Sequence, residues 1–140
     1  MLPPIGKYII DKVLGEGGFG RAYLAFDREL GQPVAIKRLR AAGDPDLLKR
    51  FQMEIRTTAS LRHKSIVIIH ASGEEGGDPY LVMEYLEGQT LKQVIQEQRP
   101  LSLLDKVNIM TQVAEGLAYA HSKGVVHRAG GVAAFFRGLR

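Results

Sequence analysis

Apolar and β-branched positions in the first forty residues fall into three short runs separated by turn-forming residues. The runs are Tyr8 to Leu14, Arg21 to Phe26 and Pro33 to Leu39. A cluster of glycines separates the first two, and Asp27 to Gln32 carries the turn residues between the last two. Short strand-like runs joined by turn chemistry are typical of adjacent antiparallel strands. The pattern therefore predicts a three-stranded antiparallel meander.

The next segment changes to a helical period. Asp44 is a good N-cap residue and Pro45 suits the first helical position, so the sequence predicts that a helix begins here. Its apolar positions lie near one face at helical spacing. They are Leu48, Phe51, Ile55 and Leu61.

A second hairpin and a short helix follow. Ile66 to His70 and Tyr80 to Glu84 are apolar runs on either side of a turn predicted at Gly73 to Pro79. Thr90 is expected to cap a helix over Leu91 to Gln98.

The clearest helix is predicted over Ser102 to Ser122. Ser102 and Asp105 have the spacing of a capping box, and Gly124 suits the C-terminal cap. The order β-β-β-α-β-β-α-α indicates an α+β fold. The apolar stripe expected on this last helix consists of Val107, Met110, Val113, Ala114, Leu117 and Ala118.

Composition narrows the class of protein. The 140 residues suffice for one modest domain or part of a larger one, and 45% apolar residues is ordinary for a globular protein. The net charge of +4 comes from scattered basic residues, which does not favour a nucleic-acid partner. The chain has no cysteine, which excludes disulfides and thiol catalysis. No signal peptide and no apolar run of about 20 residues is present, so we expect no membrane segment and a cytoplasmic location.

The run Gly15 to Gly20 has the form G-x-G-x-x-G. A dinucleotide-binding fold would require a helix directly after it, whereas Arg21 to Phe26 is strand-like. No Lys-Ser or Lys-Thr follows, which excludes a Walker-type loop. A glycine loop between two antiparallel strands can instead lie close over phosphates and present N–H donors to them. By itself the run is equally compatible with a plain hairpin turn.

Lys37 bears on the choice between a phosphate-binding loop and a plain hairpin turn. It lies within the apolar strand Val34 to Leu39, where an ammonium group needs an anion because an unpaired buried charge is costly. Alternatively, the lysine extends its ammonium to solvent at a sheet edge. Glu54 lies in the predicted first helix and could supply the carboxylate partner.

These features together resemble the N-terminal lobe and first C-lobe helix of a protein serine/threonine kinase, most similar to the bacterial eukaryotic-like group. The departures are Ala22, where valine is usual, and Lys64-Ser65, where Pro-Asn is commoner. Similarity covers residues 8 to 128, about half of a typical kinase domain. The matching segments are Leu14 to Tyr23, Val34 to Lys37, Phe51 to Ile55, Leu61 to Val67, Tyr80 to Gly88 and Val125 to Arg128.

The resemblance implies a five-stranded antiparallel sheet with one helix, and it implies a role for each matching residue. Lys37 and Glu54 would be the catalytic pair, with Lys37 on the α- and β-phosphates of ATP. The glycine run would cover the phosphates, and Glu84 and Leu86 would bond the adenine through their backbones. The ATP-binding residues implied are Leu14, Gly15, Glu16, Gly17, Gly18, Phe19, Gly20, Ala22, Ala35, Lys37, Val67, Met83, Glu84 and Leu86.

The catalytic motif breaks off after His127 and Arg128. Ala129 stands where the family has the aspartate that accepts the substrate proton. No Asp-Phe-Gly follows, so the magnesium that the intact family uses has no ligands here. Residues 129–140 do not resemble a kinase.

The sequence thus predicts residues 8–86 as an N-lobe, 87–128 as the start of a C-lobe and 129–140 as an unrelated tail. Its expected function is ATP binding by a kinase domain fragment whose intact parent phosphorylates Ser or Thr of proteins. Two alternatives remain open. The chain is a non-catalytic, pseudokinase-like module that docks on a partner kinase, or it is a decayed fragment without function.

Overall fold

In the computed structural model, the residues described are 2–17, 20–40 and 43–125. They form two compact units, which we treat separately. The first unit comprises residues up to Ser60 together with Ile68–Tyr85. The second comprises Leu61–Val67 and the chain from Leu86 onward.

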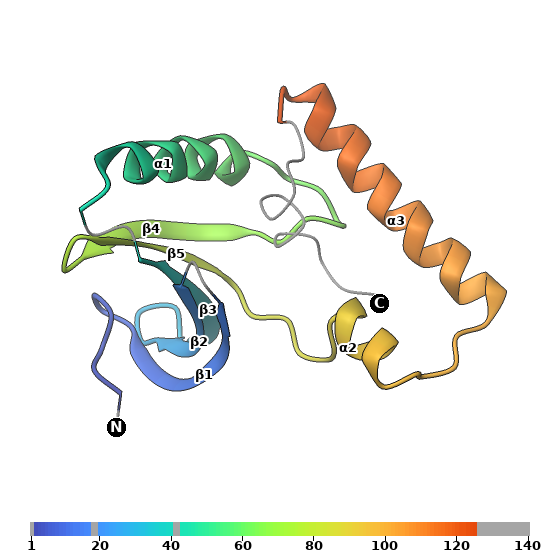
Figure 1. Ribbon diagram of the computed structural model, residues 1–140, viewed down its shortest axis with the longest axis horizontal. Helices are drawn as coiled ribbons and strands as arrows, with labels where there is room; N and C mark the ends of the chain where they lie inside the picture. The colour runs from blue at the N-terminus through green and yellow to red at the C-terminus, as the bar shows by residue number, and fades with distance from the viewer. Residues whose placement is uncertain (1, 18–19, 41–42, 126–140) are drawn as a thin grey trace. The chain divides into compact units, whose positions relative to one another are not determined.

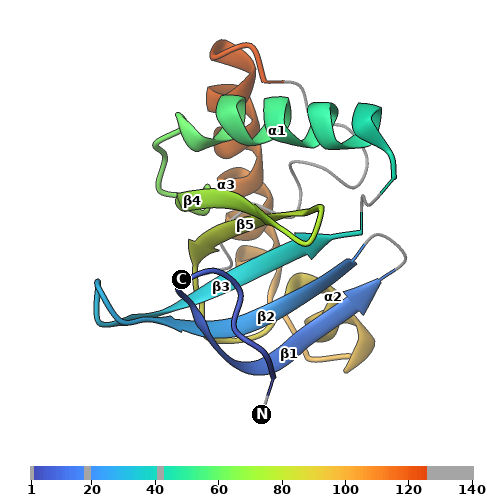
Figure 2. The same cartoon turned by 90° about the vertical axis from the view of Figure 1, so that its left-hand side faces the viewer.

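The first unit is a five-stranded antiparallel sheet with one helix. Its strands lie in the order β1-β2-β3-β5-β4, so β1 and β4 form the edges (Figures 1 and 2). The helix α1 packs against β4 and β5. The predicted sheet and first helix are thereby confirmed. The element bounds are β1 Ile9–Gly17, β2 Gly20–Asp27, β3 Gln32–Leu39, α1 Pro45–Ala59, β4 Ile69–Glu75 and β5 Asp78–Glu84.

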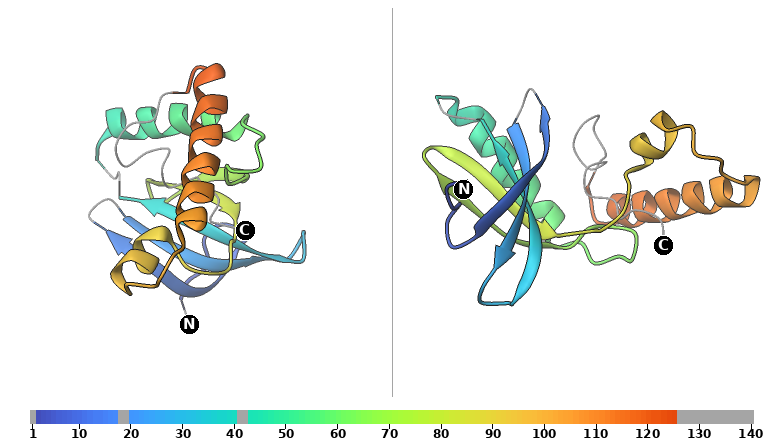
Figure 3. Two further views of the ribbon diagram at one scale, coloured as in Figure 1. Left: turned by 90° about the vertical axis from the view of Figure 1, so that its right-hand side faces the viewer. Right: turned by 90° about the horizontal axis from the view of Figure 1, so that it is seen from below.

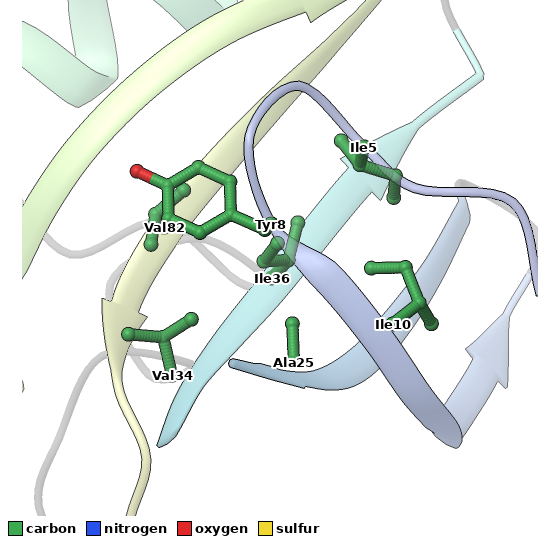
Figure 4. Packing of buried hydrophobic residues seen from close by; sticks show 7 residues of the cluster. All are labelled: Ile5, Tyr8, Ile10, Ala25, Val34, Ile36 and Val82. Carbon is green, nitrogen blue, oxygen red and sulfur yellow. The ribbon is translucent and has the colours of Figure 1, made fainter. Parts of the chain in front are cut away.

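Side chains alternate between two faces of this sheet, and we name each face after one residue of β3. The Ile36 face carries the buried cluster shown in Figure 4. The N-terminal segment covers part of it, because Ile5 and Tyr8 are buried against the strands and pair with each other through their backbones. The Lys37 face is the opposite one. The cluster consists of Ile5, Tyr8, Ile10, Ala25, Val34, Ile36 and Val82.

The second hairpin differs from the prediction. β4 spans Ile69–Glu75 rather than residues 66–70, and the turn is only Gly76 and Gly77. Both glycines have positive φ, 62° and 83°, which suits a two-residue hairpin turn. β4 is an edge strand, so its polar alternate residues can face solvent. The predicted apolar run begins too early because Ile66 packs elsewhere.

Ile66 belongs to the second unit. Leu61 and Ile66 are buried there against Ala120 and Val125. The N–H of Arg62 donates to the Tyr119 hydroxyl at 3.1 Å. This segment therefore packs on the last helix, although the sequence places it in the N-lobe.

The second unit also contains α2 (Leu91–Gln96) and α3 (Leu103–Ser122). Figure 3 shows α3 as one unbroken helix. Both helices begin with a complete capping box: Thr90 with Gln93, and Ser102 with Asp105. The predicted caps at Thr90 and Ser102 are confirmed.

The buried face of α3 differs from the predicted apolar stripe. Ile109, Gly116 and Ala120 are buried, whereas Val107 and Met110 are 51% and 60% exposed. Val113 and Leu117 of the predicted stripe are half-buried, so the stripe overlaps the buried side of the helix only at its edge. None of the helices in the described part of the chain has the length and apolar character of a membrane span.

Candidate nucleotide-binding site

The glycine run and the lysine lie in one row across the sheet. Gly15 of β1 pairs with Ala22 of β2, Ala22 pairs with Lys37 of β3, and Lys37 pairs with Leu81 of β5. Directly paired residues in antiparallel strands project to the same face. The structure thus places Lys37 two strands from the first glycine, on the face that carries Ala22.

The next row on the same face is apolar. Ala35 pairs with Leu24 on one side and with Met83 on the other. Ala35 and Met83 are half-buried, and Leu14 at the β1 edge is 43% exposed. This row therefore presents a partly exposed apolar surface next to Lys37.

Lys37 itself is half-buried. Among the side chains that the structure describes, no carboxylate forms an ion pair with its ammonium group. A lysine in this position favours an anionic partner, because partial burial removes water from its charge.

Glu54, the predicted carboxylate partner of Lys37, lies in α1. The buried residues of this helix include Phe51, Ile55 and Thr58, and position 54 shares their helical spacing. The side chain of Glu54 lies outside the described part, so the Lys37–Glu54 pair stays a prediction.

The structure explains why the last residue of the run is a glycine. Gly20 has φ +154°, and a Cβ there would overlap the backbone carbonyl of Arg38 on β3. At Gly15 nothing lies within 4 Å of a Cβ. Close approach of β3 therefore requires glycine at position 20 but not at position 15.

We expect Gly20→Ala to destabilise the chain by roughly 2 to 5 kcal/mol, because backbone overlap adds to a strained φ. The matched control, Gly15→Ala, should change stability by about 0.5 kcal/mol or less. Urea unfolding followed by circular dichroism measures both. Equal losses in the two variants would contradict the packing assigned to Gly20.

Glu16 projects to the Ile36 face rather than toward Lys37. Its Oε1 accepts from Arg21 Nε at 2.8 Å and from an Arg40 guanidinium nitrogen at 3.0 Å. The hydrogen bond from Arg21 is the main cause that lowers the pKa of Glu16 below its usual value. Any contribution of Glu16 to a nucleotide would therefore come from its backbone.

Glu84 ends β5 and has a role that the sequence did not reveal. Its N–H donates to the Ile68 carbonyl at 2.9 Å, and its carboxylate accepts from the Ile68 N–H at 3.0 Å. These two bonds join the end of β5 to Ile68. Val67 and Leu86 belong to the second unit, where Val67 is buried and Leu86 half-buried.

Some predicted residues lie outside the described part of the chain. These are Gly18, Phe19 and residues 126–140, which include His127, Arg128 and Ala129. For the residues described, no group of three His, Asp or Glu side chains could hold a metal ion.

Comparison with known proteins identifies the family. Residues 8–129 match the protein kinase domain family. The chain belongs to this family, and the relatives below place it with bacterial serine/threonine kinases.

Serine/threonine-protein kinase PrkC of Bacillus subtilis is 44% identical over 125 residues, which cover 88% of this chain and 19% of PrkC. PknA of Mycobacterium tuberculosis is 38% identical over 130 residues, 88% of this chain and 30% of PknA. The crystal structure of the M. tuberculosis PknI kinase domain has a TM-score of 0.80 at 31% identity. It matches over 90% of this chain, which spans 52% of that domain.

Proposed function

We propose that this chain binds ATP on the Lys37 face of the sheet, as the nucleotide-binding part of a serine/threonine kinase. The observation that carries the proposal is the row Gly15, Ala22, Lys37 and Leu81. It puts a half-buried ammonium group beside the base of a glycine-rich hairpin, and family membership makes ATP the expected ligand.

In this proposal Lys37 bonds the α- and β-phosphates, and Glu54 fixes the lysine's position. The backbone of residues 15–20 covers the phosphates with N–H donors. The adenine lies beside the phosphates on the same face of the sheet, and its apolar contacts are Leu14, Ala22, Ala35 and Met83.

The intact family uses magnesium-bound ATP to phosphorylate serine or threonine of protein substrates, and we propose the same for the parent of this chain. For the 140 residues themselves we propose binding without transfer. Ala129 replaces the proton acceptor, and no Asp-Phe-Gly motif supplies a metal ligand.

We expect calorimetry to show weak ATP binding that does not depend on magnesium. A complete kinase domain supplies further adenine contacts that these 140 residues lack. Their loss should lower the affinity for ATP about ten- to a hundred-fold. Lys37→Met should weaken binding by a further tenfold or so, because it removes charge-assisted bonds to phosphate. Lys49→Met, an exposed lysine of α1, is the matched control and should bind like the unaltered chain. Equal effects of both lysine variants would contradict the role given to Lys37.

The exposed apolar face of α3 favours a second candidate, a non-catalytic module that docks on another protein. Leu103 and Leu104 are 77% and 69% exposed. This candidate requires no nucleotide, so loss of ATP binding would leave it standing while removing the first.

A further inference from the structure

The Ile36 face changes character along β3. Val34 and Ile36 are fully buried in the apolar cluster, but the same face continues with Arg38 and then Arg40. There the surface is hollowed into a pocket of about 230 Å³. Its lining comes from β2, β3, the residue after β3, and β5. The lining residues are Arg21, Tyr23, Arg38, Arg40 and Asp78.

Neighbouring carboxylates hold the three arginines of this pocket. Glu16 accepts from both Arg21 and Arg40, at 2.8 and 3.0 Å. Arg38 lies 3.5 Å from Asp78 and donates to the Glu75 carbonyl at 3.1 Å. Each of these bonds uses one nitrogen of its guanidinium, whereas a guanidinium has five N–H donors. The arginines are thus oriented and retain donors.

The charge around the pocket is positive. Three guanidinium groups lie beside the two carboxylates of Glu16 and Asp78, and the hydrogen bond from Arg21 lowers the pKa of Glu16 below its usual value. Arg38 and Asp78 are the more covered pair, with side chains 30% and 19% exposed. The pocket therefore favours an anion, with desolvation greatest at Arg38.

The volume of the pocket and the geometry of its donors indicate which kind of anion it binds. The volume is below the range of about 300 to 1,000 Å³ typical of pockets that enclose a whole small molecule. Arginine forks match the oxygens of phosphate, and several converging on one point are typical of phosphate recognition. The ring of Tyr23 adds an apolar wall.

We propose that this pocket binds a phosphate monoester dianion, on the sheet face opposite Lys37. Arg21, Arg38 and Arg40 donate to its oxygens. Two carboxylates oppose it as like charges: Asp78, which lines the pocket, and Glu16, which bonds Arg21 and Arg40. The proposal does not depend on ATP binding, because it uses other residues on the other face.

Fluorescence anisotropy of the full chain with a labelled phosphoserine peptide tests this site. The unphosphorylated peptide should bind at least about tenfold more weakly, because the charge-assisted bonds are lost. Competition by inorganic phosphate shows whether the phosphate group alone suffices. Arg40→Gln should weaken peptide binding about tenfold, and its 61% exposed side chain makes misfolding no concern. Glu16→Gln should strengthen binding by about threefold, since it removes one opposing charge while its amide oxygen still accepts from Arg21 and Arg40.

Two controls locate the effect. Arg28→Gln changes an exposed arginine in the β2–β3 turn, and Lys37→Met changes the other face. Both should bind the phosphopeptide like the unaltered chain. If Arg28→Gln weakens binding as much as Arg40→Gln, the attraction is general surface charge and the proposal is wrong. It is equally overturned if Lys37→Met abolishes binding or if Glu16→Gln weakens it.

Discussion

A polypeptide of these 140 residues should transfer no phosphate from ATP to protein, and Ala129→Asp should not restore transfer. A kinase needs the proton acceptor and its metal ligands together, and groups that act as a unit cannot be restored one at a time. The substitution supplies the aspartate, but neither the asparagine of the catalytic loop nor an Asp-Phe-Gly motif occurs in the sequence.

Radiolabelled ATP with a generic protein substrate measures this directly. Lys37→Met is the background control, because any true transfer should require the lysine. Incorporation by the unaltered chain, or by Ala129→Asp, above that of the Lys37→Met chain would refute the prediction.

The same polypeptide should also self-associate, and α3 should be the cause. Leu103, Leu104, Val107 and Met110 are all more than half exposed on one side of this helix. Each large apolar side chain gains about 1.5 to 3 kcal/mol on full burial, so four together are a strong drive to associate.

Light scattering coupled to size exclusion measures the association. The double variant Leu104→Gln with Met110→Gln should shift the chain toward monomer. The control, Lys106→Gln with Asn108→Gln, changes two exposed polar positions of the same helix and should leave association unchanged. A monodisperse monomer for the unaltered chain would show that the exposed side chains are tolerated, and the docking candidate would lose its main support.

How far the sequence predicts the fold depends on each element's position. β2 and β3 are internal strands, and their runs of apolar and small residues gave bounds within a residue of those observed. Helix starts were also predictable, because Asp44, Thr90 and Ser102 each accept a backbone N–H as expected. The sequence misplaces β4, because the polar residues of an edge strand lack the apolar pattern that is typical of a strand.

The direction of Glu16 could not be predicted from alternation alone. The register of β1 shifts between Val13 and Gly15, which pair with Tyr23 and Ala22. These partners are adjacent in β2 and face opposite sides, so the irregularity moves Gly15 to the Lys37 face and Glu16 to the other. Such a register shift is set by cross-strand pairing and not by the local sequence.

The candidate site was predictable in its β3 part. Alternation put Lys37 and Ala35 on one face, and pairing supplied Met83. Leu81, which completes the row of Lys37, was missed because its strand register is a tertiary property. The buried side of α3 was missed for the same reason: Ile109 and Ala120 face inward because of what packs on them.

The measurement that tests the central claim most directly is whether ATP protects Lys37 from chemical modification. An ATP analogue that acylates lysine near the phosphates would be applied to the full chain, and modified lysines mapped by mass spectrometry. The account predicts that Lys37 is the main modified lysine, that excess ATP suppresses this, and that Lys49 is unaffected by ATP. Modification spread evenly over the lysines, or labelling of Lys37 that excess ATP leaves unchanged, would contradict an ATP site on this face.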